Sequence, residues 1–235
     1  MEKSRILVWD LPLRVFHWLL VVTFAGAFLT AESERVRDLH VALGYTFAGL
    51  LAFRLVWGLI GSRYARFSSF AFGPKAVVAY LRSLLTRHPV HHVGHNPAGS
   101  WVIYAIVVLG LVIAASGYAV YDDLGGKWIE SLHEGAANAM LALVVFHVAG
   151  VVVSSLAHRE NLAAAMVTGY KTGRPSEAIA RTRWVTAAAL AAVIAVLWSG
   201  AVEVPGVFPL PASATASKEA GRPHHPHDEA RRHDG

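Results

Sequence analysis

The sequence predicts an all-α integral membrane protein, in which a four-helix transmembrane bundle is followed by a fifth transmembrane helix. Of its 235 residues, 54% are hydrophobic and only 16% are charged, whereas a soluble domain carries about a quarter charged residues. Five apolar stretches also approach the roughly 20 residues that cross the hydrocarbon core of a bilayer. These stretches are Val15–Ala31, Leu39–Ile60, Ser100–Tyr121, Ile129–Leu156 and Trp184–Val202.

The tryptophans support the same five spans, because aromatic residues gather where a membrane-spanning helix meets the lipid headgroups. All seven lie at or near the end of a predicted span. They are Trp9, Trp18, Trp57, Trp101, Trp128, Trp184 and Trp198. Charge is almost absent from the spans, and Arg54 is the clear exception.

The distribution of Lys and Arg predicts the orientation. Alternating spans place thirteen of these residues on the N-terminal side and seven on the other side. The positive-inside rule then predicts a multi-pass protein of the cell inner membrane, with a cytoplasmic N-terminus and a periplasmic C-terminus. The basic residues form no dense arm, so no nucleic-acid partner is expected. A cleaved signal peptide is disfavoured because Trp9-Asp10 precedes the first span and no A-x-A site follows it.

The remaining segments divide the chain into three parts. Residues 1–173 form the predicted bundle, 174–203 the fifth helix with its preceding loop, and 204–235 a polar tail expected to be disordered. Between the second and third spans, Pro74 starts a predicted interfacial helix, for which a solvated connecting helix is the alternative. Its apolar face is expected to comprise Val77, Tyr80, Leu81, Leu84 and Leu85.

The chain contains no cysteine. This excludes disulfides, iron–sulfur clusters, thiolate zinc sites and covalent haem attachment through C-x-x-C-H. Any redox cofactor must therefore be held by nitrogen or oxygen ligands.

Four histidines lie within or at the ends of spans, where ionisable groups are costly and usually face the bundle interior. His133 and His147 are fourteen residues apart on the fourth span. That spacing places them on one helix face, about 21 Å apart along the axis. Span direction matches His17 in depth with His147, and His40 in depth with His133. Two facing imidazoles can clamp an iron porphyrin; satisfied core histidines or a proton path are the alternatives.

Several motifs resemble the prokaryotic cytochrome b561 family, which includes the b-type cytochrome subunits of nickel–iron hydrogenases. The resemblance covers roughly residues 6–173. It is carried by Trp9-Asp10-Leu11-Pro12 with Arg14, Phe16 and His17-Trp18, Leu39-His40 with Gly44, Phe53-Arg54 with Trp57-Gly58, Gly61 and Ser62, Leu132-His133-Glu134, His147-Val148-Ala149-Gly150, and His158-Arg159-Glu160-Asn161-Leu162.

The resemblance implies a four-helix bundle that holds two non-covalent b haems, with ligands from the first, second and fourth helices. These ligands fall on His17 with His147 and on His40 with His133. Arg54 is a candidate partner for a propionate of the cytoplasmic-side haem, although snorkelling to the interface also explains it.

Other candidates are weaker. Asn96 is either a quinone head-group donor or a helix cap. Glu134 orients His40, handles protons or is simply an outer-surface acid. An outer loop is expected either to dock a basic cytochrome or to be merely solvated; it contains Tyr118, Tyr121, Asp122 and Asp123. A histidine cluster is expected to lie in a solvated loop, with adventitious metal binding as the alternative; its members are His88, His91, His92 and His95.

The leading function is electron transfer between the quinone pool and an external partner such as a c-type cytochrome. Alternatives are the membrane anchor of a hydrogenase-like oxidoreductase with its catalytic subunit, or a superoxide:quinone oxidoreductase. A non-redox transporter would be colourless. The sequence leaves open whether the bundle forms a homodimer.

Overall fold

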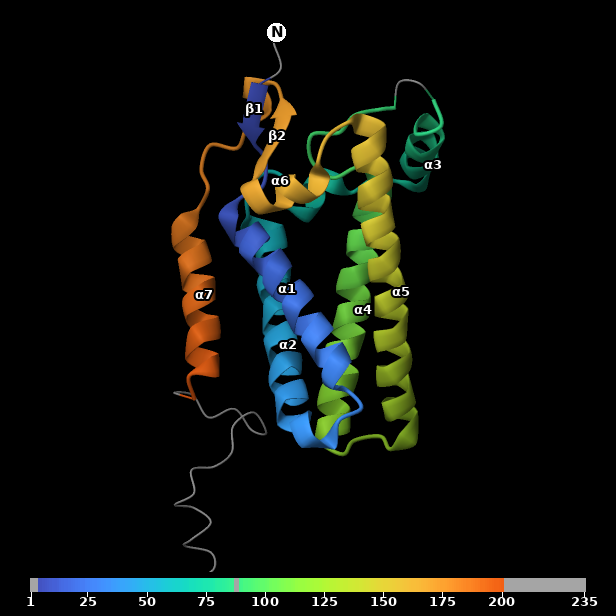
Figure 1. The fold of residues 1–235 in the computed structure, drawn as a ribbon, viewed down its shortest axis with the longest axis vertical. Coiled ribbons are helices and arrows are strands. Elements are labelled where there is room, and N and C mark those ends of the chain that lie inside the picture. The colour runs from blue at the N-terminus through green and yellow to red at the C-terminus, as the bar shows by residue number, and fades with distance from the viewer. Residues whose placement is uncertain (1–3, 87–88, 201–235) are drawn as a thin grey trace, which may run out of the picture.

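The computed structural model describes residues 4–86 and 89–200 and is mostly helical (Figure 1). Within this part, four helices are long and apolar enough to cross a membrane. They are α1 (Leu11–Thr30), α2 (Arg37–Ile60), α4 (Pro97–Tyr121) and α5 (Lys127–His158). Each begins two to four residues before its predicted span. The first four predicted spans are therefore confirmed as helices.

Side-chain caps explain why two of these helices begin where they do. Asp10 accepts a hydrogen bond from the Leu13 backbone N–H at 2.9 Å, and Asn96 accepts one from Gly99 at 2.7 Å. A proline follows within the first turn of both helices, where its missing N–H costs nothing.

The bundle consists of two antiparallel helix pairs that meet along one seam (Figure 1). Close packing joins α1 with α2, α4 with α5, and α2 with α4, whereas α5 packs at most marginally on α1 or α2. Phe47 and Leu51 of α2 meet Ile113 of α4 and Met140 of α5 in the core along that seam. Met140 lies on the same face of α5 as His133 and His147, seven residues from each, so this face reaches the seam between the two histidines.

The two ends of the bundle differ. At one end, here called the sheet end, β1 (Ser4–Leu7) pairs antiparallel with β2 (Tyr170–Gly173), beside α6 (Leu162–Thr168) and the 3-10 turn η3 (Pro175–Glu177). At the opposite end, here called the loop end, only short connections join α1 to α2 and α4 to α5 (Figure 1). The first of these connections contains the 3-10 turn η1 (Glu34–Val36).

The segment between α2 and α4 covers the sheet end with the 3-10 turn η2 (Phe67–Phe70) and helix α3 (Pro74–Ser83). The predicted helix is confirmed, and it begins at Pro74 as expected. Of its predicted apolar face, Tyr80 is buried and Leu81 is 48% exposed. Leu84 and Leu85 lie beyond Ser83, where the helix ends. Whether this face lies on the membrane or in solvent stays a prediction.

The fifth predicted span corresponds to α7 (Trp184–Trp198), which lies beside α1 (Figure 1). Its 15 residues cover about 22 Å at 1.5 Å per residue, less than the hydrocarbon core. The Trp198 indole N–H donates to the Thr46 hydroxyl at 3.0 Å, which fixes α7 to α2. Residues 201–202 of the predicted span and the predicted tail lie outside the described residues.

Candidate functional site

His40 and His133 lie side by side at the loop end. Their ring centroids are 6.3 Å apart, with an angle of 81° between the ring planes. His40 Nδ1 lies 2.8 Å from the Ala27 carbonyl oxygen, and His133 Nδ1 lies 3.1 Å from that of Ile113. A carbonyl accepts but cannot donate, so each Nδ1 carries the proton and each Nε2 keeps a lone pair. The Ser116 hydroxyl also lies 3.1 Å from His133 Nδ1, and since it donates to the Val112 carbonyl at 2.7 Å, it can accept from the same N–H.

This geometry fits a bis-histidine metal site. Two metal–nitrogen bonds of about 2 Å each, with about 1.1 Å from each nitrogen to its ring centre, place two axial imidazoles about 6 Å apart. The observed centroid separation of 6.3 Å agrees with that value. A backbone carbonyl on the second nitrogen is also the usual way in which a protein orients a histidine ligand.

Glycine provides the room that His133 needs. A Cβ atom added at Gly117 of α4 would lie only 2.8 Å from the His133 Cε1 atom. Beside His40, a Cβ at Gly44 would meet nothing within 4 Å, so that face is open. Gly135 and Gly150 are instead exposed on α5 and do not line this space.

His17 and His147 lie toward the sheet end, on α1 and α5. Their side chains interact electrostatically, but within the described residues no ring contact joins them. His17 packs edge-on against Trp18, with ring centroids 5.1 Å apart. Its Nδ1 is buried and has no hydrogen-bond partner. The protein therefore positions this pair less completely than the loop-end pair.

His95 is half-buried and packs against aromatic rings at the sheet end, so its predicted place in a fully solvated loop is wrong. Its ring centroid lies 4.6 Å from Trp9 and 4.4 Å from Phe70. Burial, reinforced by the charge of Arg54, lowers the pKa of His95 to about 3, so the ring is neutral. Its Nδ1 is shut off from solvent and unpartnered.

The other described members of the histidine cluster lie in different surroundings. His91 lies at the surface 3.4 Å from Glu160, whereas His92 packs against the rings of Phe72 and Tyr80. His88 lies outside the described residues. Within the described part of the chain, no group of three or more metal-binding side chains is present.

Arg54 is only 3% exposed, so it does not snorkel to the membrane interface. Its guanidinium donates to the Ala65 carbonyl at 3.1 Å and lies 4.4 Å from the centre of the Phe67 ring. Gly58 permits this arrangement, because a Cβ there would lie 2.0 Å from Phe67. The nearest opposite charge is the buried Asp10, whose carboxylate accepts from the Trp57 indole at 3.1 Å.

Three further expectations can be placed. The Asn96 side-chain oxygen caps α4, which supports the capping interpretation. Glu134 is exposed, and His40 is oriented by Ala27 instead. The predicted outer loop is exposed at Tyr118 and at residues 121–123. This is expected both for a loop that docks a basic cytochrome and for one that is merely solvated.

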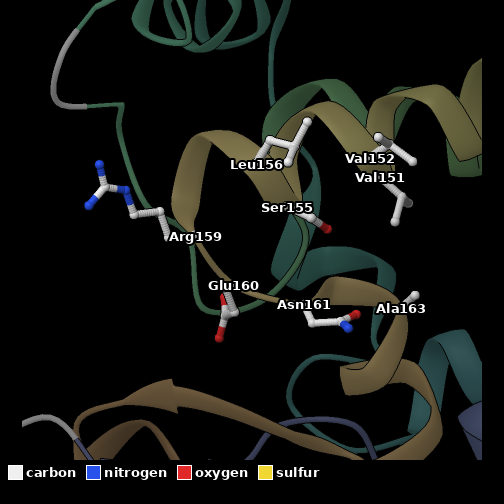
Figure 2. A pocket seen from close by; sticks show the side chains of 8 residues that line it. All are labelled: Val151, Val152, Ser155, Leu156, Arg159, Glu160, Asn161 and Ala163. Carbon is white, nitrogen blue, oxygen red and sulfur yellow. The ribbon is translucent and has the colours of Figure 1, made fainter.

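A groove of about 380 Å³ opens where α5 ends (Figure 2). It begins at Val151, one turn beyond His147 on the same helix. Its wall is apolar near Val151 and Val152, and its rim is polar. In Figure 2, the Arg159 side chain points away from Glu160 and Asn161. The groove is thus amphipathic, and His147 is not among the residues that line it.

Sequence reasoning missed Gly117 and the partial burial of His95. A helical glycine has many explanations, and the pattern HxxHHxxH is typical of polar loops. The neighbours that give these two residues their environment lie 16 to 86 positions away in the chain.

Comparison with known proteins finds a family and relatives over most of the chain. The family model described as prokaryotic cytochrome b561 matches residues 8–169. The probable Ni/Fe-hydrogenase B-type cytochrome subunit of Rhizobium leguminosarum bv. viciae is 23% identical, over 75% of this chain and 92% of that protein. The corresponding subunit of Azotobacter vinelandii is 24% identical, over 72% and 90%. No solved structure matches the chain significantly.

The family match spans more than half of the chain and contains all four candidate histidine ligands. The chain therefore belongs to the prokaryotic cytochrome b561 family and is a multi-pass membrane cytochrome that carries haem b and transfers electrons.

Proposed function

We propose that this cytochrome binds two b haems, one between His40 and His133 and one between His17 and His147. In this role it carries electrons across the cell inner membrane between the quinone pool and an external redox partner. The observation that carries the proposal is the loop-end pair, whose 6.3 Å separation and backbone-bonded Nδ1 atoms suit axial ligation.

The histidines define the chemistry. Each haem supplies a one-electron carrier when bound. If both histidines of each pair hold its haem, the group would supply one-electron transfer and would not bind oxygen or substrate. His133 and His147 share one face of α5 and lie about 21 Å apart along its axis. This spacing arranges the two sites in series across the membrane.

Arg54 is proposed to neutralise a propionate at the sheet-end site. It is buried, and its one hydrogen bond in the described residues goes to a neutral carbonyl. A buried cation is strongly destabilising unless an anion lies close by. The excess of Lys and Arg on this side supports a cytoplasmic sheet end and a periplasmic loop end.

Quinone is proposed to react at the sheet end. The groove that begins one helical turn beyond His147 combines apolar valines with a polar rim, which suits a molecule with an apolar tail and a polar head group. Asn96 is less suited to bind the head group than its position suggests, because its oxygen already caps α4.

The loop end is proposed to receive a positively charged partner such as a c-type cytochrome. Among the residues that the structure describes, seven acidic and three basic side chains are exposed there, which leaves an excess of four negative charges. Such complementarity steers a basic partner and raises its rate of association. The acids are Glu32, Glu34, Asp38, Asp122, Asp123, Glu130 and Glu134, and the bases are Arg35, Arg37 and Lys127.

A second candidate is the membrane anchor of a hydrogenase, because the relatives are described as hydrogenase cytochrome subunits. Stable co-purification with a hydrogenase catalytic subunit favours this candidate, whereas a freely exchanging c-type cytochrome favours the first.

The decisive experiment is a reduced-minus-oxidised visible spectrum of the purified protein, with a pyridine haemochrome assay. We expect low-spin b-type bands and about two haems per chain. One haem per chain contradicts the second histidine pair, and no haem after expression with sufficient haem contradicts both.

A further inference from the structure

Four buried side-chain nitrogen or oxygen atoms have no hydrogen-bond partner in the described residues, and all four lie toward the sheet end. They are Arg14 Nε, His17 Nδ1, Ser62 Oγ and His95 Nδ1. Buried polar side-chain atoms are nearly always hydrogen-bonded, so each exception calls for an explanation. The loop-end histidines show no such exception, because both Nδ1 atoms are bonded to carbonyl oxygens.

His95 and Ser62 belong to the surroundings of Arg54. His95 lies within electrostatic range of both Arg54 and His147. Ser62 begins the turn that follows α2, in which its carbonyl accepts from Ala65, and Arg54 donates to the Ala65 carbonyl. Two neutral donors and one guanidinium thus gather beside a proposed haem ligand.

The local charge favours an anion. Asp10 interacts electrostatically with both Arg14 and Arg54, so one carboxylate faces two guanidiniums. None of the ion pairs in the described residues includes Arg54, and Lys171 is already paired with Glu160. A carboxylate beside Arg54 would balance the second positive charge and accept hydrogen bonds from the two neutral donors.

We propose that His95 and Ser62, together with Arg54, bind the propionate carboxylates of the haem at the sheet-end pair. This assignment rests on the proposed function. Trp9 and Phe70 both pack against the His95 ring and restrict its rotation, so its N–H is presented in a fixed direction at little entropic cost. A neutral quinone head group gains less from the guanidinium and is the competing occupant.

The test is a potentiometric titration of the purified protein in detergent, with the two haem components fitted separately. His95→Phe keeps an aromatic ring between Trp9 and Phe70 but removes the N–H donor, and Ser62→Ala removes the hydroxyl. His92→Phe and Ser69→Ala are the matched controls. A His133→Ala variant, which retains only the sheet-end pair, identifies the component that belongs to that site.

In His95→Phe, we expect the ratio of reduced to oxidised sheet-end haem at a fixed potential to fall at least threefold. For a one-electron couple this equals a shift of about 28 mV. The loss of a donor leaves the propionate charge less neutralised, which disfavours reduction. Ser62→Ala should shift the same component in the same direction, and His95→Asn, which retains an N–H donor, should recover part of the shift.

Unchanged potentials in both His95→Phe and Ser62→Ala overturn the carboxylate site while leaving the two-haem proposal intact. Unchanged potentials with slower haem reduction by a water-soluble quinol also overturn it, and assign His95 to a quinone head group instead. An equal shift of the potential in the control His92→Phe would show a general structural effect of the substitution, and it would also contradict the proposed carboxylate site. A wild-type protein without haem overturns the proposed function and this inference together.

Discussion

The two histidine pairs differ in what holds them in place. At the loop end, the backbone fixes both rings, through Ala27 for His40 and Ile113 for His133, and Gly117 makes room for one of them. At the sheet end, His17 has a buried Nδ1 without a partner, and Arg54 and His95 add further polar groups nearby.

On the proposed function, this contrast corresponds to two ways of building a haem site in one bundle. The loop-end site is preorganised by hydrogen bonds to ligand nitrogens, and such bonds raise ligand basicity. The sheet-end site is built from donors and a buried cation, which stabilise added negative charge. A basic ligand favours oxidised iron, whereas a nearby cation favours reduced iron. We therefore expect the sheet-end haem to have the higher midpoint potential.

Removal of a ligand should have the largest effect. His133→Ala should lower the haem content from about two to about one per chain, because only the sheet-end pair then remains complete. His147→Ala should also lower the haem content to about one per chain, but the haem that remains is then the one at the loop end. Pyridine haemochrome assays combined with redox titration measure both. If either variant retains two low-spin haems, the assigned pairing is wrong.

Gly117→Ala should selectively disturb the loop-end site. Alanine favours a helix over glycine by about 0.5–1 kcal/mol, but its Cβ would lie 2.8 Å from the His133 ring. Displacement of a well-packed ring costs about 1–3 kcal/mol. The loop-end haem should therefore bind more weakly, as measured by haem retention during competition with apomyoglobin.

The matched control for this change is Gly135→Ala, where a Cβ meets nothing within 4 Å. That variant should retain both haems as firmly as the wild type. Equal losses in the two variants would mean that Gly117 has no special relation to His133.

The four long spans were predictable because an apolar run of about 20 residues has few other places to fold. The depth matching of the histidines also followed from helix rise and span direction. The pairing of β1 with β2 did not, because two four-residue strands, joined over more than 160 positions, carry almost no local signal. His95 was misjudged for a related reason, since Trp9 and Phe70 reach it only through the tertiary fold.

Arg54→Gln should reduce the difference in potential between the two haems. The substitution removes a buried positive charge that favours reduction at the sheet end, so only that component should fall. A decrease of at least tenfold in the reduced-to-oxidised ratio corresponds to about 59 mV for a one-electron couple. Arg63→Gln, at an exposed arginine that stacks on Tyr64, is the control. If the potential of the loop-end haem falls instead, Arg54 acts on that haem and its assignment to the sheet-end site is wrong.

Glu160→Gln should have the smallest effect, on stability at the rim of the sheet end. Burial by itself would raise the pKa of Glu160, but the Thr172 N–H and the Lys171 ammonium lower it below its ordinary value of 4.5. A carboxyl whose pKa is lowered by folding stabilises the protein above the unfolded pKa, and this contribution is lost as the pH falls through the folded value.

Thermal unfolding followed by circular dichroism should therefore show Glu160→Gln melting below the wild type at pH 7, by about 2–4 °C for each kcal/mol lost. The gap should narrow as the pH falls below about 4.5, because wild-type Glu160 is then protonated as well. Glu134→Gln, at an exposed acid of the loop end, should melt like the wild type at every pH. A gap that stays constant into acid would mean that packing of Glu160, rather than its charge, stabilises the sheet end.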